Sequence, residues 1–462
     1  MIQMTAAQIA ATTGGRLLGP ELVTVTGAVR TDSRLVEAGD LFVALKGETH
    51  DGHDFIHAAV AAGAAIVIAE GEFDIPVPLV AVPDSITALA DLARQVVATV
   101  RARGALKVIA VTGSNGKTTT KNMVAAICSS IGPTIAPIAS FNNEVGAPMT
   151  MLRVEEDTEY LVLEYGADGV GDITKLVSIV MPDVAIVLTV GVAHIGKFGD
   201  QASIALAKSE LVRDLPPTAT AVLNGDDPNV RAMADVTRAE VLWFSLDDAS
   251  GISVEATGTH FTVEGRRIEL RIHGEHNAMN ALAAIRATSA VGIPFETAVT
   301  ALESMTRAER WRMEILDGPD GVAIINDAYN ASPDSMAAGL RTLADLTRGR
   351  ARSVAVLGEM AELGDISVEE HERIGLLVVR LNIDQLVVVG QGAFPIHRSA
   401  QQEGSWGGES LYVESIDDAY DVVRGLLRTG DVVLVKSSNA AGLRHLGDRL
   451  AEHSATDDGG RA

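Results

Sequence analysis

Apolar residues occur in short, continuous runs along the chain, and helix-like segments separate most of these runs. Examples are KVIAV at residues 107–111, VAIVLTV at residues 184–190 and VVLVKSS at residues 432–438. A strand that is apolar at consecutive positions is buried on both faces, whereas a half-exposed strand alternates apolar and polar residues. Buried strands joined by helices are typical of parallel, doubly wound sheets. The pattern therefore predicts an α/β protein.

The same pattern changes at two places where we expect a domain boundary. At residues 96–107 a helix ends, a glycine follows and a new strand begins, and at residues 304–315 another helix gives way to a strand. A chain of 462 residues is also too long for one ordinary core. We predict three domains, over residues 1–104, 105–310 and 311–462.

The composition is that of a soluble globular protein, and it argues against several classes of function. Asp and Glu total 61 against 37 Lys and Arg, so the formal net charge is −24 and general nucleic-acid binding is disfavoured. The single cysteine, Cys128, excludes an intrachain disulfide and a cysteine metal cluster. The sequence shows neither a signal-peptide pattern nor an apolar run as long as a membrane span, so we expect a cytoplasmic protein. We also expect a monomer.

The segment VTGSNGKTTT, residues 111–120, has the composition of a phosphate-binding loop. It departs from the usual P-loop pattern because Val111 stands where the first glycine is expected. The loop joins a predicted strand to a predicted helix, so free backbone N–H groups and the positive helix end point at one spot. A glycine turn without a ligand is the alternative interpretation. The candidate phosphate-binding residues are Gly113, Ser114, Asn115, Gly116, Lys117, Thr118 and Thr119.

This loop resembles the shortened P-loop of the Mur ligase family, the ATP-dependent amide-forming enzymes of peptidoglycan precursor synthesis in cell-wall biogenesis. Folylpolyglutamate synthases share a related loop, so the loop alone indicates a superfamily. The resemblance implies a central P-loop-type sheet that binds ATP and a Rossmann-like C-terminal domain. Lys117 would then be catalytic, through its charge on the transferring phosphoryl group.

Glu164, His194 and Lys208 follow the loop in the order in which this family carries its metal site. Glu164 and His194 follow apolar strands, and the carboxyl ends of parallel strands are where such sheets place ligands. Taken singly, each residue has an ordinary structural alternative. The resemblance implies two Mg²⁺ ions, one on Thr118 and Glu164 and one on the catalytic residues His194 and Lys208. An ammonium has no lone pair, so Lys208 would be carbamylated.

Further residues are assigned to ATP through the same resemblance. The HNAMN segment places Asn277 and Asn280 beside the adenine, and the WRME segment places Arg312 on the phosphates. Trp311 replaces the glycine that is common before this arginine in the family. Asp327, in the segment DAYNASPDS, would also lie at the ATP site.

The N-terminal region resembles the uridine-nucleotide-binding domain of Mur ligases that accept a UDP-N-acetylmuramoyl-tripeptide. The residues that carry this resemblance are Asp32, Ser33 and Arg34 and the loop at residues 47–52; a polar turn between strands is the alternative. In the central region, the segment SFNNEVGAP resembles the loop that meets the muramoyl peptide. The substrate residues it implies are Asn142 and Asn143.

The DAYNASPDS segment, residues 327–335, resembles the branch of the family that adds D-alanyl-D-alanine, with Asn330 near the substrate. Ligases that add diaminopimelate or lysine would carry Asp-Asn-Pro-Arg, which is absent here. The expected reaction activates a carboxylate as an acyl phosphate, which an amine then attacks. A diamino-acid-adding ligase, a folylpolyglutamate synthase and a non-catalytic nucleotide-binding protein are the alternatives. The departure from the family pattern after Lys436 leaves that lysine without an assigned role.

Overall fold

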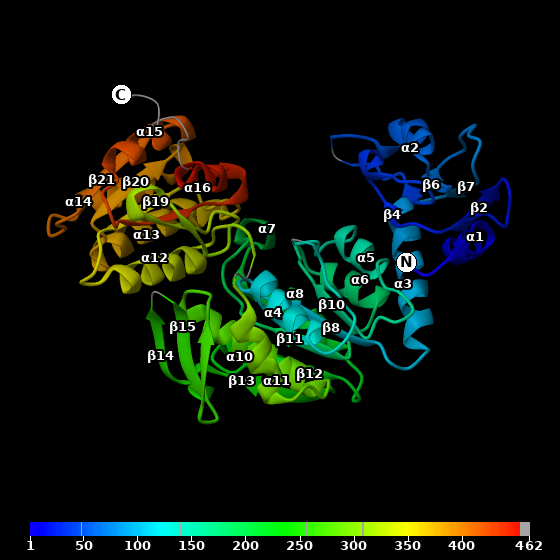
Figure 1. Cartoon of the computed structure of the whole chain (residues 1–462), viewed down its shortest axis with the longest axis horizontal. Coiled ribbons are helices and arrows are strands. Elements are labelled where there is room, and N and C mark those ends of the chain that lie inside the picture. Colours follow the sequence, from blue (N-terminus) through cyan, green and yellow to red (C-terminus); the bar gives the residue numbers. More distant parts are fainter. Residues whose placement is uncertain (48, 139, 256, 307–308, 453–462) are drawn as a thin grey trace, which may run out of the picture.

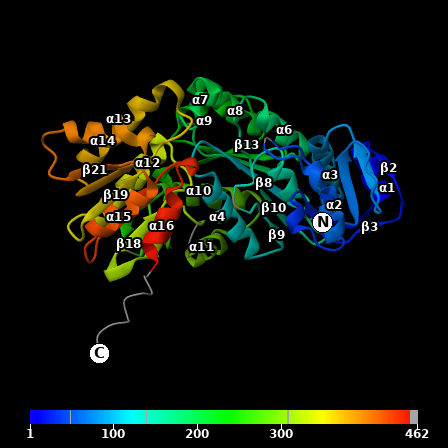
Figure 2. The same cartoon turned by 90° about the horizontal axis from the view of Figure 1, so that it is seen from above.

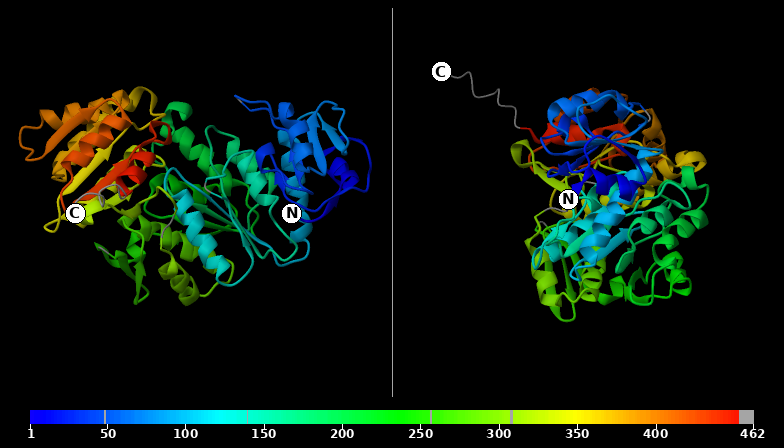
Figure 3. Two further views of the ribbon diagram at one scale, coloured as in Figure 1. Left: turned by 45° about the horizontal axis from the view of Figure 1, so that its top comes forward. Right: turned by 90° about the vertical axis from the view of Figure 1, so that its right-hand side faces the viewer.

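The computed structural model describes residues 1–47, 49–138, 140–255, 257–306 and 309–452. Its parts lie in a row, with the N-terminal part at one end, the central part in the middle and the C-terminal part at the other end (Figure 1). Figure 2 and the left-hand view of Figure 3 show the same order from other sides. No helix among these residues is long and apolar enough to span a membrane.

The N-terminal part is built on a mostly parallel sheet in which only β2 runs antiparallel to its neighbour. Its strands in spatial order are β2 (Arg16–Leu18), β7 (Leu79–Val82), β6 (Ile66–Glu70), β5 (Leu41–Val43) and β4 (Val29–Arg30). The other elements are β1 (Met4–Thr5), which pairs with β3 (Thr24–Val25), and the helices α1 (Ala6–Thr13), α2 (Ile56–Ala62) and α3 (Ser85–Arg101).

The central part contains a parallel sheet that is buried on both faces. Its strands in spatial order are β13 (Glu240–Phe244), β12 (Thr220–Asn224), β11 (Val184–Val187), β8 (Lys107–Thr112), β10 (Tyr160–Glu164) and β9 (Thr134–Ile135). In β8, Val108 and Ala110 belong to one apolar cluster and Ile109 and Val111 to another, as expected for side chains that alternate across a sheet.

Helices cover both faces of this sheet, and a small antiparallel sheet adjoins it (Figure 1). The helices are α4 (Lys117–Ser129), α5 (Gly146–Met151), α6 (Asp172–Ile179), α7 (Ile195–Phe198), α8 (Gln201–Arg213), α9 (Pro228–Arg231), α10 (Glu275–Ala290) and α11 (Phe295–Ser304). The small sheet consists of β14 (Ser250–Glu255), β15 (Gly258–Val263) and β16 (Arg266–Leu270).

The C-terminal part is a second α/β unit whose sheet is parallel except for β17. Its strands in spatial order are β17 (Glu314–Asp317), β18 (Ala323–Asn326), β22 (Val432–Lys436), β19 (Ser353–Leu357), β20 (Gln385–Val389) and β21 (Glu409–Val413). Its helices are α12 (Pro333–Thr347), α13 (Ser367–Arg380), α14 (Phe394–Gln402), α15 (Ile416–Leu426) and α16 (Leu443–Ala451).

The predicted α/β class and its doubly wound parallel sheets are confirmed. Helix α3 ends at Arg101 and β8 begins at Lys107, so the first predicted boundary falls between two elements. The domain bounds themselves remain predictions. Residues 307–308 of the second joint and residues 453–462 of the last predicted domain lie outside the described residues.

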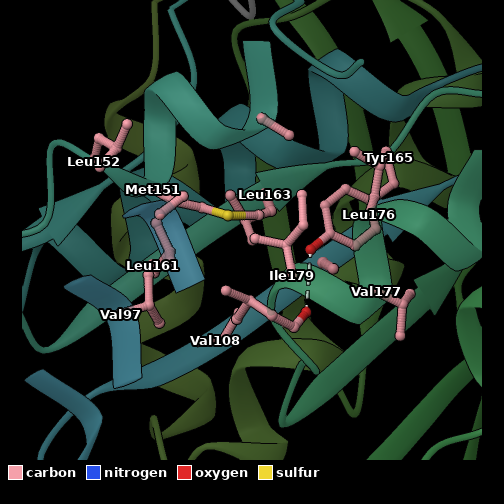
Figure 4. Packing of buried hydrophobic residues seen from close by; sticks show 14 of the residues in the cluster. Val97, Val108, Met151, Leu152, Leu161, Leu163, Tyr165, Leu176, Val177 and Ile179 are labelled. Carbon is pink, nitrogen blue, oxygen red and sulfur yellow. Dashed lines mark hydrogen bonds between the residues drawn. The ribbon is translucent and has the colours of Figure 1, made fainter. Parts of the chain in front are cut away.

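One apolar cluster joins the N-terminal and central parts. It runs from Ile9 and Val43 through α3 to Met151 of α5 and Leu161 of β10, all of which are buried. Figure 4 shows Val97 of α3 together with Met151 and Leu161 in this cluster. The two parts therefore share a core and are not separate bodies joined by a linker.

Candidate active site

The glycine loop forms the turn between β8 and α4. Gly113 has φ 152° and Gly116 has φ 81°, a backbone region that other residues seldom adopt. A Cβ on Gly116 would lie 2.4 Å from Oδ1 of Asn280, and one on Gly113 would lie 2.9 Å from Cβ of Leu188. Both glycines are therefore required by conformation and by close packing, and the loop brings its backbone N–H groups to the start of α4.

Lys117 stands at the first position of α4 and folds back over the loop. Its Nζ donates to the carbonyl oxygens of Gly113 at 2.8 Å and Ser114 at 3.4 Å. Burial lowers the pKa of Lys117, and the nearby Glu164 carboxylate opposes that shift. Thr118 and Thr119 are buried beside it.

A cavity of about 520 Å³ lies between the loop and the C-terminal part. Residues from both the central and C-terminal parts line it, although they are far apart in the sequence. Those that the sequence predicted for ATP or substrate are Ser114, Asn115, Gly116, Lys117, Thr118, Thr119, Asn277, Asn280, Arg312, Asp327 and Asn330. The structure thus gathers nearly all of the predicted nucleotide residues at one place.

A second cavity, of about 480 Å³, lies on the other side of the loop. Asn142, Asn143, His194 and Lys208 line it. The first cavity also includes Lys117 and Ser114 of the loop, so these residues separate the two spaces. A phosphoryl group held by the loop would therefore face a group bound in the second cavity.

Glu164 ends β10 and is almost completely buried. Its Oε1 accepts a hydrogen bond from Nδ2 of Asn142 at 2.8 Å, while its Oε2 is buried without a hydrogen-bond partner. A buried carboxylate oxygen without a partner is costly unless a cation or proton satisfies it. Asn142, which the sequence assigned to the substrate, contacts this carboxylate.

Lys208 lies on α8 and is also buried. Burial, with a smaller effect from the Lys117 charge, lowers its pKa from the ordinary value to about 7. Its Nζ lies 5.9 Å from the ring centroid of Phe198. Within the described residues, no group of three or more His, Cys, Asp or Glu side chains could hold a metal ion. The observation here that points to a cation is therefore the unpartnered Oε2 of Glu164.

His194 precedes α7 with a left-handed φ of 61°. Its Nδ1 pairs with the carboxylate of Glu362, which belongs to the C-terminal part. Burial lowers the pKa of His194, and the hydrogen bond to Glu362 opposes that effect. Sequence reasoning did not identify Glu362, because no local motif links it to His194.

The predicted adenine residues bond to one another on α10. Asn280 Nδ2 donates to Oδ1 of Asn277 at 3.0 Å, and Asn277 Nδ2 donates to the carbonyl of His273 at 2.8 Å. The hydroxyl of Thr120, on α4, donates to Oδ1 of Asn280 at 3.3 Å. These contacts fix the side of the first cavity that lies beside the glycine loop.

The C-terminal residues form a second charged group at this cavity. Lys436 Nζ donates to Oδ2 of Asp327 at 2.6 Å and to the carbonyl of Asn330 at 3.1 Å. The Arg312 guanidinium lies 4.6 Å from the Tyr329 ring centroid, and its Nε is buried without a hydrogen-bond partner. Lys436, which received no role from the sequence, ends the buried strand β22 much as Glu164 ends β10. Its position at the end of a buried strand was the sequence signal that could have identified Lys436.

The N-terminal candidates lie apart from both cavities. Asp32 caps a short helical turn and pairs with Arg34, whose hydrogen bonds lower the pKa of Asp32 to about 2. Ser33 follows Asp32 in that turn. In the adjacent loop, residue 48 lies outside the described residues. The structure leaves the three residues on the surface of the N-terminal part, where a long substrate would have to extend to reach them.

A glycine loop on a parallel sheet, opposed across a cavity by a second α/β unit, is the arrangement of a nucleotide-binding protein of the P-loop type. The chain belongs to the Mur ligase family. The family models that match it are the Mur ligase family catalytic domain at residues 26–112, the middle domain at residues 111–288 and the glutamate ligase domain at residues 311–439.

Relatives and solved structures agree with this assignment. The UDP-N-acetylmuramoyl-tripeptide–D-alanyl-D-alanine ligase of Mycobacterium tuberculosis is 42% identical, over 97% of this chain and 98% of that protein. Crystal structure I of MurF from Acinetobacter baumannii has a TM-score of 0.88 at 31% identity, covering 98% of this chain and 99% of that one. MurF ligase from Thermotoga maritima, solved in complex with ADP, has a TM-score of 0.80 at 28% identity, covering 92% and 97%. The predicted family, fold and ligase class are confirmed.

Proposed function

We propose that this chain joins D-alanyl-D-alanine to UDP-N-acetylmuramoyl-tripeptide with ATP as the energy source. The observation that carries the proposal is that Asp327 and Asn330, from DAYNASPDS, line the same cavity as the glycine loop. The resemblance of that segment to the D-alanyl-D-alanine branch and the name of the relative from M. tuberculosis support this substrate pair. The reaction would take place in the cytoplasm, where ATP is available, with the protein acting as a monomer.

ATP would occupy the first cavity, with its adenine beside Asn277 and Asn280 and its phosphates on the loop. Backbone N–H groups after Gly113, together with the ammonium of Lys117, would stabilise the charge on the transferring phosphoryl group. Arg312 would add a second cation from the C-terminal side, because its guanidinium stands at the cavity with one buried nitrogen unsatisfied.

The second cavity would hold the carboxylate that is activated. Lys117 and Ser114 line both cavities, so this carboxylate would lie beside the loop that holds the γ-phosphate and attack it to give an acyl phosphate and ADP. The amine of D-alanyl-D-alanine would then attack the acyl carbon and release phosphate. Asn142 and Asn143 would contact the muramoyl peptide, and Asp32, Ser33 and Arg34 the uridine nucleotide. The C-terminal part would exclude water from the acyl phosphate.

The reaction would also use two Mg²⁺ ions. Thr118 and Glu164 would hold one ion, which satisfies the free Oε2 of Glu164, and His194 with a carbamylated Lys208 would hold the other. When bound, such ions neutralise phosphate charge and polarise the transferring group. The neutral amine of Lys208 can attack CO₂ and lose a proton to form the carbamate. A pKa of about 7, caused first by burial, makes a large fraction of this amine neutral near physiological pH.

Phosphate release tests this function directly. The protein is mixed with ATP, Mg²⁺ and UDP-N-acetylmuramoyl-tripeptide, and D-alanyl-D-alanine, diaminopimelate or lysine is added separately. Release should require the dipeptide, and Lys117→Ala should slow it at least about 100-fold. Lys107→Ala, at the exposed start of β8, is the matched control and should behave like the wild type. Release with a diamino acid and a UDP-dipeptide would instead favour the diamino-acid-adding ligase, and no release with any amine would favour the non-catalytic alternative.

A further inference from the structure

The C-terminal part contacts the central part next to His194, through the segment that contains Glu362. The Glu362 carboxylate accepts from Nδ1 of His194 and pairs with Nζ of Lys197, with Oε1 at 2.8 Å from that nitrogen. Lys197 also reaches Asp168, at 3.0 Å, in the loop after β10. We call the contact of Glu362 and Gly364 with His194, Gly196 and Lys197 the Glu362 latch.

Backbone atoms take part in the latch as well. The Gly196 N–H donates to the carbonyl of Glu362 at 2.9 Å. A Cβ on Gly196 would lie 2.8 Å from that oxygen and 2.9 Å from the Gly364 nitrogen, so only glycine allows this approach. Glu362 and His194 both have left-handed φ angles, of 62° and 61°. Such conformations are unfavourable for these residues and persist only where surrounding contacts hold them.

Contacts of His371 within the C-terminal part hold the segment that carries Glu362. His371 is fully buried on α13, and its Nε2 accepts from the N–H of Met360 at 2.9 Å. Its Nδ1 lies 2.7 Å from the carbonyl oxygen of Ser367 and donates to it. The backbone on both sides of Glu362 is therefore held by contacts within the C-terminal part.

The latch determines how the imidazole of His194 is presented. A carboxylate on Nδ1 keeps the proton there and leaves the Nε2 lone pair free. The ring lines the second cavity together with Lys117 and Lys208. We propose that Glu362 is a positioning residue, which fixes His194 in the Nδ1–H tautomer with Nε2 available to a divalent cation. Because Glu362 comes from the C-terminal part, this site is complete only while that part is docked.

The catalytic role of Glu362 rests on the proposed function, whereas the tautomer of His194 does not. The first test therefore measures the tautomer and needs no substrate. Protein labelled with ¹⁵N-histidine is studied by NMR at a pH where the ring is neutral, and His194→Gln identifies the signals of His194. The wild type should show the Nδ1–H tautomer. Glu362→Ala should shift the ring toward the Nε2–H form that free histidine prefers. Glu362→Gln, whose amide oxygen can still accept, should restore the Nδ1–H form.

Kinetics supply the second test. Glu362→Ala should raise the Mg²⁺ concentration needed for half-maximal phosphate release about 10- to 100-fold, with little change in the KM for ATP. Gly196→Ala should raise the Mg²⁺ requirement as well and also the KM for ATP, because it obstructs docking of the part that carries Arg312 at the ATP cavity. Glu369→Ala, an exposed residue of α13, is the control and should match the wild type.

An unchanged tautomer and an unchanged Mg²⁺ requirement in Glu362→Ala would contradict the proposal that Glu362 positions His194. Glu362→Gln is the control for a folding defect, because it replaces only one carboxylate oxygen with an amide nitrogen. If the wild type releases no phosphate with any amine, the proposed function fails, while the tautomer measurement still tests the latch.

Discussion

The central part meets its two neighbours in different ways. Toward the N-terminal part it shares a continuous apolar cluster that includes Val97 and Met151. Toward the C-terminal part, the contact includes several polar pairs, and Ile195 of α7 packs against the edge of the C-terminal apolar cluster. Besides the Glu362 latch, Ser332 Oγ donates to Oδ1 of Asn115 at 2.9 Å, and Ser140 Oγ lies 2.6 Å from the hydroxyl of Tyr329.

This difference indicates which junction can open. Separating the N-terminal part would expose apolar surface at a cost of about 25 cal/mol per Å². Polar groups at the other junction can exchange their partners for water, so the net cost of each contact is only about 1 kcal/mol. We therefore expect the C-terminal part to undock and redock during catalysis, while the N-terminal and central parts move together.

The largest effect is expected from a cavity in the shared apolar cluster. Met151 is fully buried on α5, so Met151→Ala should lower the free energy of unfolding by about 2–5 kcal/mol. Urea titration followed by circular dichroism measures the change. Met149→Ala, on the same helix but only partly buried, should cost clearly less. Equal losses from both variants would contradict the idea of a shared core.

A smaller effect is expected inside the C-terminal part, at Trp311. The Trp311 indole N–H lies 3.0 Å from the Asp448 carboxylate, and the ring stacks on Tyr329 at a centroid distance of 6.5 Å. Trp311→Ala should lower the free energy of unfolding by about 1–3 kcal/mol.

Trp311 also has a left-handed φ of 58°, which accounts for the glycine common at this position in the family. Trp311→Gly should therefore cost about 1 kcal/mol less than Trp311→Ala. Thermal unfolding of both variants tests this order. If the alanine variant is the more stable one, backbone strain does not contribute at this position.

The free energy of unfolding should depend on pH through Asp334, at the junction with the C-terminal part. A Cβ on Gly191 of the central part would lie 2.3 Å from its Oδ2, so this carboxyl group faces the junction. Burial raises the pKa of Asp334 above its ordinary value of 3.8; Asp227 adds to the shift, while Arg373 and Arg341 oppose it. Between pH 3.8 and the raised pKa, the folded state keeps a proton that the unfolded state has lost. The free energy of unfolding therefore falls as pH rises through this interval.

Asp334→Asn should remove this pH dependence and leave a flatter profile. Unfolding midpoints measured at successive pH values, with exposed Asp365→Asn as the control, show whether it does. A profile of Asp334→Asn that runs parallel to the wild type would exclude Asp334 as the source.

The smallest effect is expected for Cys128. Its thiol is fully buried on α4, and burial raises its pKa to about 12, so very little thiolate exists at neutral pH. A thiol reagent should leave the native protein unmodified and react fully in denaturant. Glu362→Ala should be equally unreactive, because opening the polar junction leaves the central core closed. Rapid labelling of that variant would show that the two junctions are coupled.

Local sequence patterns predicted the elements near the site well. The glycine loop, the strand before it and the helix after it are adjacent in the chain. Glu164 ends one strand of the parallel sheet and His194 follows another, as expected. Such features depend on backbone conformation, side-chain periodicity and short-range hydrogen bonds, which neighbouring residues determine. Whether these residues act as the resemblance implies remains a prediction.

The sequence by itself determined the α/β class, the phosphate loop and the order of the family motifs, because each is written in adjacent residues. Only the tertiary structure brought Glu362 to His194, 168 positions away, and Lys436 to Asp327, 109 positions away. It alone also showed that the N-terminal junction is a continuous apolar cluster and that polar pairs cross the C-terminal one. These contacts depend on how whole sheets pack against one another, and that packing is the sum of many small interactions that no single segment contains.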